Sequence, residues 1–218
     1  MTPEALWSAM ESKLIAILRG ITPPETAEIV GELLDAGFRA IEIPLNSPDP
    51  LTSIAIAVEV AERHTPGGCL IGAGTVLSAQ DVADVRAVGG KLIVAPNINP
   101  EVVRAATAHG MASFPGVFTA SEAHLAIQAG ATGLKFFPAF RLGPAGIAAI
   151  RATLPATTPL CAVGGIGPDD FADYLAAGVS GFGLGSNLYR VGATAEQVRL
   201  GARQALAALH RARAPVKS

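Results

Sequence analysis

Short apolar runs alternate with longer segments of helical period along nearly the whole chain. Runs rich in Val, Ile, Leu, Phe and Ala recur roughly every 20 to 30 residues, and polar residues or Gly and Pro separate each run from the helical segment after it. We count eight such pairs. The pattern predicts strands at about residues 14–18, 39–43, 69–73, 91–95, 111–115, 133–137, 160–163 and 181–184.

The expected helices have recognisable ends. Four of them close on a glycine, which adopts the left-handed conformation that ends a helix. The closing segments are D-A-G-F (35–38), A-H-G-M (108–111), Q-A-G-A (128–131) and A-A-G-V (176–179). Proline, a hydroxyl or a carboxylate is typical of the first turn, and such residues open the helices at Pro23, Ser78, Pro100, Thr119 and Pro168.

Eight β-then-α units with continuous apolar strands predict a closed parallel barrel inside a ring of helices. We therefore expect a single (β/α)8 TIM barrel domain over residues 1–218. An open doubly wound sheet is the alternative, but L-R-G-I-T-P (18–23) stands where a dinucleotide-binding sheet would have G-x-G-x-x-G. No Pro/Gly/Ser-rich linker divides the chain. The tail at 211–218 is basic and lacks an apolar period, so we expect it to be frayed.

The charge balance argues against polyanionic partners. Half of the 218 residues are hydrophobic, 16% are charged, and the formal net charge is -2. The sequence therefore lacks the basic field that attracts nucleic acid or an anionic membrane surface. We expect neither nucleic acid nor a membrane as a partner.

The cysteines, the N-terminal segment and the histidines favour a cytoplasmic protein without a metal. Cys69 and Cys161 are far apart, and neither belongs to a C-x-x-C pair, which is typical of buried thiols in a reducing compartment. Residues 1–13 lack the apolar core of a signal peptide, and no stretch approaches the roughly 18 apolar residues of a membrane span. The four histidines show no H-x-H or H-x-x-x-H spacing.

One lysine interrupts an apolar run. Lys135 lies within A-T-G-L-K-F-F-P (131–138), where a buried strand would desolvate its ammonium and favour the neutral amine. A neutral lysine amine attacks carbonyl carbons. The alternative is a lysine whose stem lies along the core while its charged end reaches water or pairs with a carboxylate.

Two more charged residues lie at the carboxyl ends of predicted strands, where the catalytic residues of such barrels gather. Glu42, in A-I-E-I-P, is expected to face the same mouth as Lys135, either as a structural ion pair or as a group that exchanges protons. Arg19 suits a substrate carboxylate because its guanidinium binds both oxygens, unless it pairs with a neighbouring acid.

Glycines follow the last two predicted strands, in G-G-I (164–166) and G-L-G-S (183–186). Backbone N–H groups without side chains can approach phosphate oxygens there, and Ser186 adds a hydroxyl donor. The alternative is that these glycines only make tight turns. Their occurrence on adjacent strands favours a phosphate site.

As a set, these motifs resemble those of the 2-keto-3-deoxy-6-phosphogluconate (KDPG) aldolase family. The similarity runs from about Leu14 to Tyr189. It is carried, in order, by E-I-P-L-N-S (42–47), G-A-G-T-V-L (72–77), P-N-I (96–98), L-K-F-F-P (134–138), A-V-G-G-I (162–166) and G-L-G-S (183–186).

The resemblance implies a metal-independent class I aldolase that needs no cofactor. It implies that Lys135 forms a Schiff base with the substrate ketone, that Glu42 is the general acid/base, and that Arg19 binds the carboxylate. Cleavage of a six-carbon 2-keto-3-deoxy-6-phospho sugar acid would give pyruvate and glyceraldehyde 3-phosphate, and family members are usually homotrimers. The implied pocket lining is Thr75, Pro96 and Phe137, and the implied phosphate site is Gly164, Gly165, Gly185 and Ser186.

Departures from the gluconate branch resemble the 2-dehydro-3-deoxy-6-phosphogalactonate (KDPGal) branch. P-L-N-S with Asn46 stands in place of a T-L-R-T-like segment, and A-V-G-G-I with Val163 stands in place of P-T-G-G-I. The opening I-L-R-G-I-T-P (17–23) agrees with this branch, so Asn46 and Val163 are the expected determinants of C4 preference. The gluconate epimer and 4-hydroxy-2-oxoglutarate are the alternative main substrates. A-F-R-L-G-P (139–144) fits the family less well and gives Arg141 no role.

Two functions of other classes stay open at the level of the sequence. A phosphate-binding barrel isomerase or epimerase would share the glycine segments but would use acid/base residues instead of a reactive lysine. A non-catalytic sugar-phosphate sensor would keep the phosphate site and use Lys135 as an ion-pair donor. Neither accounts for the apolar neighbours of Lys135 together with Glu42 and Arg19.

Overall fold

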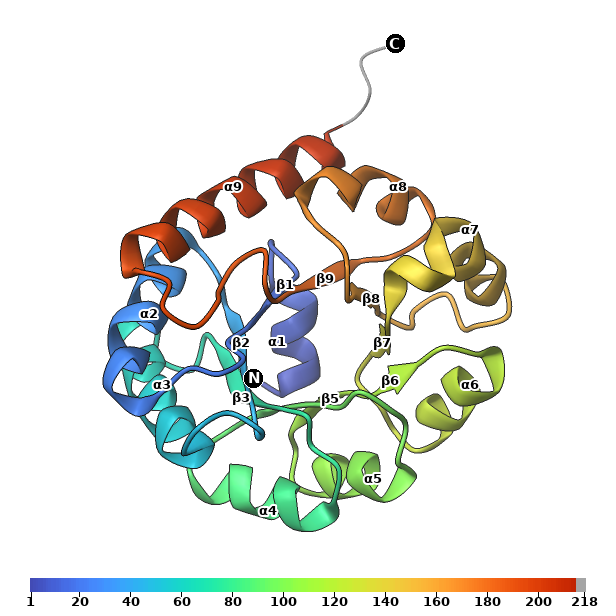
Figure 1. The fold of residues 1–218 in the computed structure, drawn as a ribbon. Helices are drawn as coiled ribbons and strands as arrows, with labels where there is room; N and C mark the ends of the chain where they lie inside the picture. The colour runs from blue at the N-terminus through green and yellow to red at the C-terminus, as the bar shows by residue number, and fades with distance from the viewer. Residues whose placement is uncertain (215–218) are drawn as a thin grey trace.

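Strands and helices alternate along residues 1–214, the part of the chain that the computed structural model describes (Figure 1). The strands are β1 (Leu14–Ile17), β2 (Ala40–Pro44), β3 (Leu70–Gly74), β4 (Leu92–Val94), β5 (Ala112–Phe114), β6 (Gly116–Val117), β7 (Leu134–Phe136), β8 (Leu160–Val163) and β9 (Gly181–Leu184). The helices are α1 (Pro3–Ala9), α2 (Pro23–Ala36), α3 (Pro50–His64), α4 (Ala79–Ala87), α5 (Pro100–Ala108), α6 (Ala120–Gln128), α7 (Ala139–Arg151), α8 (Phe171–Ala176) and α9 (Ala195–Arg213).

The strands form one parallel sheet that curls into a barrel, with helices α2 to α9 around it (Figure 1). The strand order is β5-β4-β3-β2-β1-β9-β8-β7-β6, so the first strand lies between the second and the last. Ile15 pairs with Ala40 on one side and with Gly183 on the other. The predicted single-domain β/α barrel is confirmed.

The fifth predicted strand is divided in two, which gives nine strands within residues 1–214 instead of the eight expected. Pro115 separates β5 from β6; β5 pairs with β4, and β6 pairs with β7. Proline has no N–H to donate, so the ladder is interrupted at this residue. The chain itself continues through Pro115, whose carbonyl accepts a hydrogen bond from the Lys135 N–H at 2.9 Å.

The helix ends follow the expected chemistry. Helix α2 ends at Gly37, which has a φ of 115° and donates its N–H to the carbonyls of Leu33 and Leu34. Helices α4 and α6 begin with capping boxes, formed by Ser78 with Asp81 and by Thr119 with Glu122. The side chains of these boxes satisfy N–H groups that have no partner within the helix.

Helix α1 was not predicted, and it lies across the opening of the barrel (Figure 1). It covers the end where the strands begin, since a Cβ on Gly181, the first residue of β9, would lie 3.1 Å from the Trp7 ring. Trp7 is 1% exposed and packs edge-on against Phe114, with 4.7 Å between the ring centroids. The helix spans only 7 residues, too short for an apolar period to be recognised in the sequence.

The C-terminal helix continues beyond the point where we expected fraying. The expectation placed the tail at 211–218, but α9 runs to Arg213, whose guanidinium donates hydrogen bonds to the carbonyls of Glu11 and Ser180. These contacts to two other segments stabilise the last turn. The remainder of the expected tail, 215–218, lies outside the described residues.

Alternate residues along each strand enter two separate apolar layers. Leu14 and Ala16 pack against the surrounding helices, whereas Ile15 and Ile17 belong to a cluster inside the barrel. Both layers are buried, and a parallel strand covered on both faces has a continuous apolar sequence instead of an alternating one. No helix within residues 1–214 has both the length and the apolar character needed to cross a membrane.

Candidate active site

Lys135 faces the interior of the barrel because its two neighbours face the helices. Leu134 and Phe136 belong to the outer apolar layer, and successive side chains of a strand point to opposite faces. The strand pairs Lys135 with Cys161 of β8, which lies in the inner cluster. The lysine is 6% exposed. Lys135 is therefore flanked by apolar residues in the sequence because those residues pack between the barrel and the surrounding helices.

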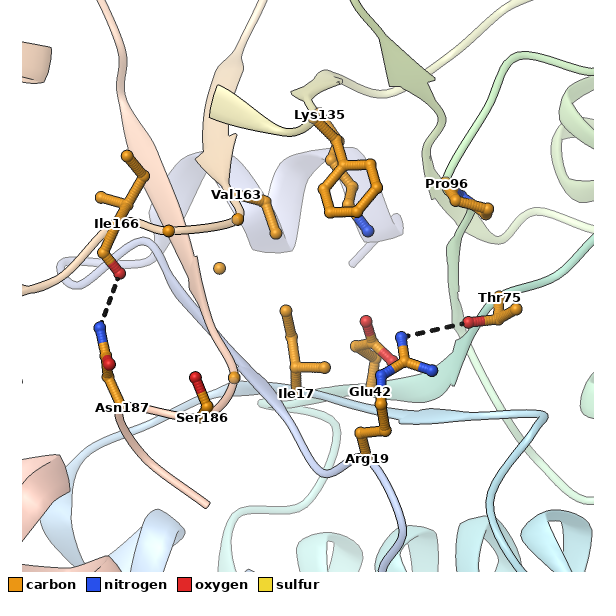
Figure 2. A pocket seen from close by; sticks show the side chains of 15 residues that line it. Ile17, Arg19, Glu42, Thr75, Pro96, Lys135, Val163, Ile166, Ser186 and Asn187 are labelled. Carbon is orange, nitrogen blue, oxygen red and sulfur yellow. Dashed lines mark hydrogen bonds between the residues drawn. The ribbon is translucent and has the colours of Figure 1, made fainter. Parts of the chain in front are cut away.

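Glu42 points into the same interior from the opposite wall of the barrel. Its neighbours Ile41 and Ile43 pack outward, and its own side chain is 1% exposed. In the strand order, β1, β9 and β8 lie between β2 and β7, so Glu42 and Lys135 approach each other across the barrel (Figure 2). The structure brings together two charged residues that are 93 positions apart in the sequence, 42 against 135.

Burial dominates the electrostatics of this pair. It raises the pKa of Glu42 from 4.5 to about 7, against the opposing effects of the Lys135 and Arg19 charges. Burial also lowers the pKa of Lys135, while the Glu42 charge acts in the other direction. Glu42 Oε2 has no hydrogen-bond partner among residues 1–214. The pair therefore combines a carboxyl that can exchange protons near neutral pH with an amine whose neutral form is favoured.

Arg19 lies beside Glu42 and is held by two polar side chains. Its Nη1 donates to Asn46 Oδ1. Its Nη2 lies 3.5 Å from Thr75 Oγ1 (Figure 2). Thr75 has a φ of 57°, a left-handed conformation that is rare for a β-branched residue. Such backbone strain is maintained only where the surrounding structure requires it, and here it accompanies the contact with Arg19.

One open cavity of about 310 Å³ at the carboxyl ends of the strands is lined by Lys135, Glu42, Arg19 and Thr75. Figure 2 shows Lys135 pointing into it from one side and Glu42 and Arg19 from the other. Among the residues predicted for the site, the cavity is lined by Arg19, Glu42, Thr75, Pro96, Lys135, Phe137, Val163, Gly164, Gly165, Gly185 and Ser186. Asn46 is not in the lining. It is connected to the site through its Oδ1, which accepts a hydrogen bond from Arg19.

The glycine segments after β8 and β9 form one end of this cavity. Gly164 and Gly165 have φ of 91° and 71°, and a Cβ on Gly165 would lie 2.9 Å from Phe140. The Asn187 side chain donates to the Ile166 carbonyl at 3.0 Å and thereby ties the two segments together (Figure 2). Backbone N–H groups and the Ser186 hydroxyl at this end suit an anion of several oxygens.

Four further residues line the cavity. Ile166 and Gly183 belong to the two glycine segments that the sequence singled out, whereas Ile17 and Asn187 were not indicated. Asn187 directly follows G-L-G-S, so its place after the last strand was the available signal. Ile17 gave none, because an isoleucine within a buried strand has the same sequence pattern on either face. Arg141, for which we had no role, lies over the Phe140 ring at 4.9 Å and is not part of the lining.

The side chains described in 1–214 include no group of three His, Cys, Asp or Glu residues placed to hold a metal ion. The charged side chains of the cavity are one amine, one carboxyl and one guanidinium, and one end of the cavity is rich in glycine. Such a set can bind an anionic carbonyl compound at two points and exchange protons with it between them.

The sequence model of the KDPG and KHG aldolase family matches residues 8–199 of this chain. The chain belongs to this family. It is 56% identical over 91% of its length, and 92% of the relative's, to the probable 2-dehydro-3-deoxy-6-phosphogalactonate aldolase of Rhizobium meliloti (strain 1021). It is 48% identical over 84% of its length, and 88% of the relative's, to the 2-dehydro-3-deoxy-6-phosphogalactonate aldolase of Escherichia coli (strain K12).

A solved structure agrees with this placement. The chain superposes on a native KDPGal structure with a TM-score of 0.89 and 46% sequence identity, over 93% of this chain and 96% of the other. The resemblance drawn from the sequence motifs is thus confirmed at the level of the aldolase family and of the fold.

Proposed function

We propose that this aldolase reversibly cleaves 2-dehydro-3-deoxy-6-phosphogalactonate to pyruvate and D-glyceraldehyde 3-phosphate through a Schiff base. The observation that carries the proposal is the convergence of Lys135 and Glu42, both buried, in one cavity. An amine with a lowered pKa and a carboxyl with a raised pKa meet the two needs of imine chemistry, a nucleophile and a proton carrier. The names of the two relatives support the choice of the galactonate epimer.

The reaction begins with attack of the neutral Lys135 amine on the C2 ketone. Loss of water leaves a protonated imine. The Glu42 carboxylate then takes the proton of the C4 hydroxyl, the C3–C4 bond breaks, and its electron pair moves into the imine to form an enamine. The C4 oxygen becomes the aldehyde of the released triose phosphate. Glu42 returns its proton to C3, and water hydrolyses the imine to pyruvate and the free amine.

Binding at two ends orients the substrate for these steps. In the proposal, Arg19 binds the C1 carboxylate with both guanidinium nitrogens, and Gly164, Gly165, Gly185 and Ser186 bind the phosphate. Thr75, Pro96 and Phe137 line the pyruvate end, and Asn46 and Val163 influence which C4 epimer is accepted. The cavity extends between these two ends, with Lys135 and Glu42 in its lining.

Borohydride reduction in the presence of pyruvate tests the mechanism. The expected result is one covalent pyruvate adduct, located on Lys135 by peptide mass spectrometry and missing from a Lys135→Met variant. An unmodified protein, or an Lys135→Met variant that still cleaves the substrate, would contradict the Schiff base. Insensitivity to borohydride combined with proton exchange would favour the isomerase class, and binding without turnover would favour a sensor.

We also propose a cytoplasmic homotrimer. Two buried free cysteines, Cys69 and Cys161, support a reducing compartment. The trimer rests on the family resemblance, and large apolar side chains exposed on the described surface support subunit contacts. These include Leu77, Phe118, Leu125, Phe140 and Leu200.

A further inference from the structure

Position 74, at the end of β3, lies directly against the Glu42 carboxyl group. A Cβ built on Gly74 would be 1.8 Å from Glu42 Oε2, 2.3 Å from Cδ and 2.5 Å from Oε1. These are its three nearest heavy atoms outside its chain neighbours. Cβ atoms do not approach other atoms so closely, so any side chain at position 74 must displace this carboxyl.

The backbone at Gly74 has no need of a glycine. The residue is paired with Pro44 in the parallel ladder, and its carbonyl accepts the Leu45 N–H at 2.8 Å. It is not among the described glycines with positive φ, in contrast to Gly164 and Gly165. A glycine within a strand weakens it, by roughly 0.5–1 kcal/mol relative to alanine in regular structure. What distinguishes position 74 is therefore the space that the missing side chain leaves.

That space matters because the buried oxygen Oε2 of the carboxyl is not held by a hydrogen bond from residues 1–214. Glu42 Oε2 has no partner within the described chain, so the shape of the barrel interior sets the orientation of the group. A larger residue on β3 would rotate the carboxyl about its side-chain torsions and change its position relative to the cavity. A displacement of about 1 Å of a reacting group can cost on the order of 10²-fold in rate.

We propose that Gly74 is a positioning residue. Because it has no side chain, the Glu42 carboxyl can occupy the place from which it exchanges protons with the substrate. This inference rests on the proposed function, in which Glu42 carries the proton. It assigns a purpose to the second glycine of G-A-G-T (72–75) that is separate from turn formation.

The Gly74→Ala variant tests this role. We expect kcat to fall on the order of 100-fold, with a change in KM of less than about threefold because the two binding ends are untouched. Deuterium exchange into the pyruvate methyl group should fall in parallel, since it reports the Glu42 proton step without the phosphate. Gly31→Ala is the matched control: apart from its chain neighbours and the backbone of its own helix, no heavy atom lies within 4 Å of a Cβ there, so its kinetics should equal those of the unmodified protein.

A double-variant cycle separates positioning from a general loss of structure. In a Glu42→Ala background the obstructing carboxyl is gone, so adding Gly74→Ala should change the residual rate by less than about twofold. If Gly74→Ala alone does not fold, the double variant should fold, for the same reason. An equal loss in both backgrounds, unmodified kinetics in Gly74→Ala, or a double variant that also fails to fold would overturn the inference.

The cycle also distinguishes this inference from the proposed function. A Glu42→Ala variant with full activity would remove the proton-carrying role of Glu42, and the role of Gly74 with it. A slow Glu42→Ala variant beside a fully active Gly74→Ala variant would leave the proposed function intact and overturn only the positioning role.

Discussion

At the scale of single residues, this protein places ionisable side chains where apolar packing would be more stable. Lys135 and Glu42 are both buried, and burial disfavours the charged form of each. The lysine was recognisable in the sequence because three apolar residues surround it. The glutamate was recognisable only by its place at the end of a predicted strand.

The first prediction concerns the pH dependence of stability. Glu42 has a pKa of about 7 when folded and an ordinary value of 4.5, so the folded state holds its proton more tightly. Stability relative to a Glu42→Gln variant should therefore be lost as pH rises from 4.5 to 7. Above pH 7 the free energy of unfolding of the variant should exceed that of the unmodified protein by at most about 3 kcal/mol. The variant also loses the favourable interaction of the Glu42 charge with Lys135, which makes this difference smaller.

Urea unfolding of both proteins at pH 4.5 and pH 8 measures this difference. Near pH 4.5 the two free energies of unfolding should be similar, since the carboxyl is largely protonated in the folded state. A gap that is constant with pH, or that is larger in acid, would contradict a raised pKa for Glu42.

A second prediction concerns the choice of C4 epimer. Val163 lines the cavity, and the family resemblance implies a threonine at this position in the gluconate branch. Val163→Thr keeps the side-chain shape and replaces one methyl group with a hydroxyl, so it should shift the ratio of kcat/KM values toward the gluconate epimer, by roughly tenfold. Cleavage rates on the two epimers give this ratio, with Val163→Ile as an apolar control. An unchanged ratio would remove Val163 from the determinants.

At the scale of elements, two of the departures from the expected pattern have identifiable physical causes. The fifth strand divides at Pro115, where the ladder lacks a donor. Helix α1 closes the barrel end opposite the cavity, where the inner cluster would otherwise meet water. Neither feature has a strong periodic signal, and both depend on neighbours far away in the sequence.

The third prediction is that α1 contributes to stability but not to chemistry. Trp7 is buried against Phe114, so Trp7→Ala should lower the free energy of unfolding by about 3–5 kcal/mol. The kcat/KM of the folded variant should change little, because the cavity lies at the other end of the strands. Unfolding is followed by far-UV circular dichroism, because Trp7 is the chain's one tryptophan and its replacement removes tryptophan fluorescence. Trp7→Phe should lower the free energy of unfolding by less than Trp7→Ala does. Equal decreases in the two variants would argue against packing as the cause.

At the scale of the whole molecule, barrel closure creates the candidate site. Glu42 and Lys135 lie on strands that never pair, and only the circular strand order brings their side chains to one cavity. The charge of the chain is nearly balanced, so association between copies meets little long-range repulsion.

The fourth prediction follows from the proposed homotrimer. Sedimentation equilibrium should give three times the chain mass of 22.1 kDa, independent of protein concentration in the micromolar range. If the exposed apolar side chains lie between subunits, the thermal midpoint should rise with protein concentration. A species of 22.1 kDa would contradict the proposal.

The sequence by itself determined the repeating β/α order, the strand positions to within one or two residues and the residues expected at the mouth of the barrel. It could do so because strands buried on both faces leave continuous apolar runs, and because glycine, proline and capping residues mark where elements begin and end. The motif order was also sufficient for the family.

Only the tertiary structure decided how these residues meet. Lys135 and Glu42 are both next to residues of the outer layer, and closure of the sheet turns both toward one interior. The space at Gly74, the contacts of Arg19 with Asn46 and Thr75, and the link from Asn187 to Ile166 join segments that are distant in the sequence. Local sequence pattern carries no record of such contacts, because they are fixed by the packing of separate elements around a common axis.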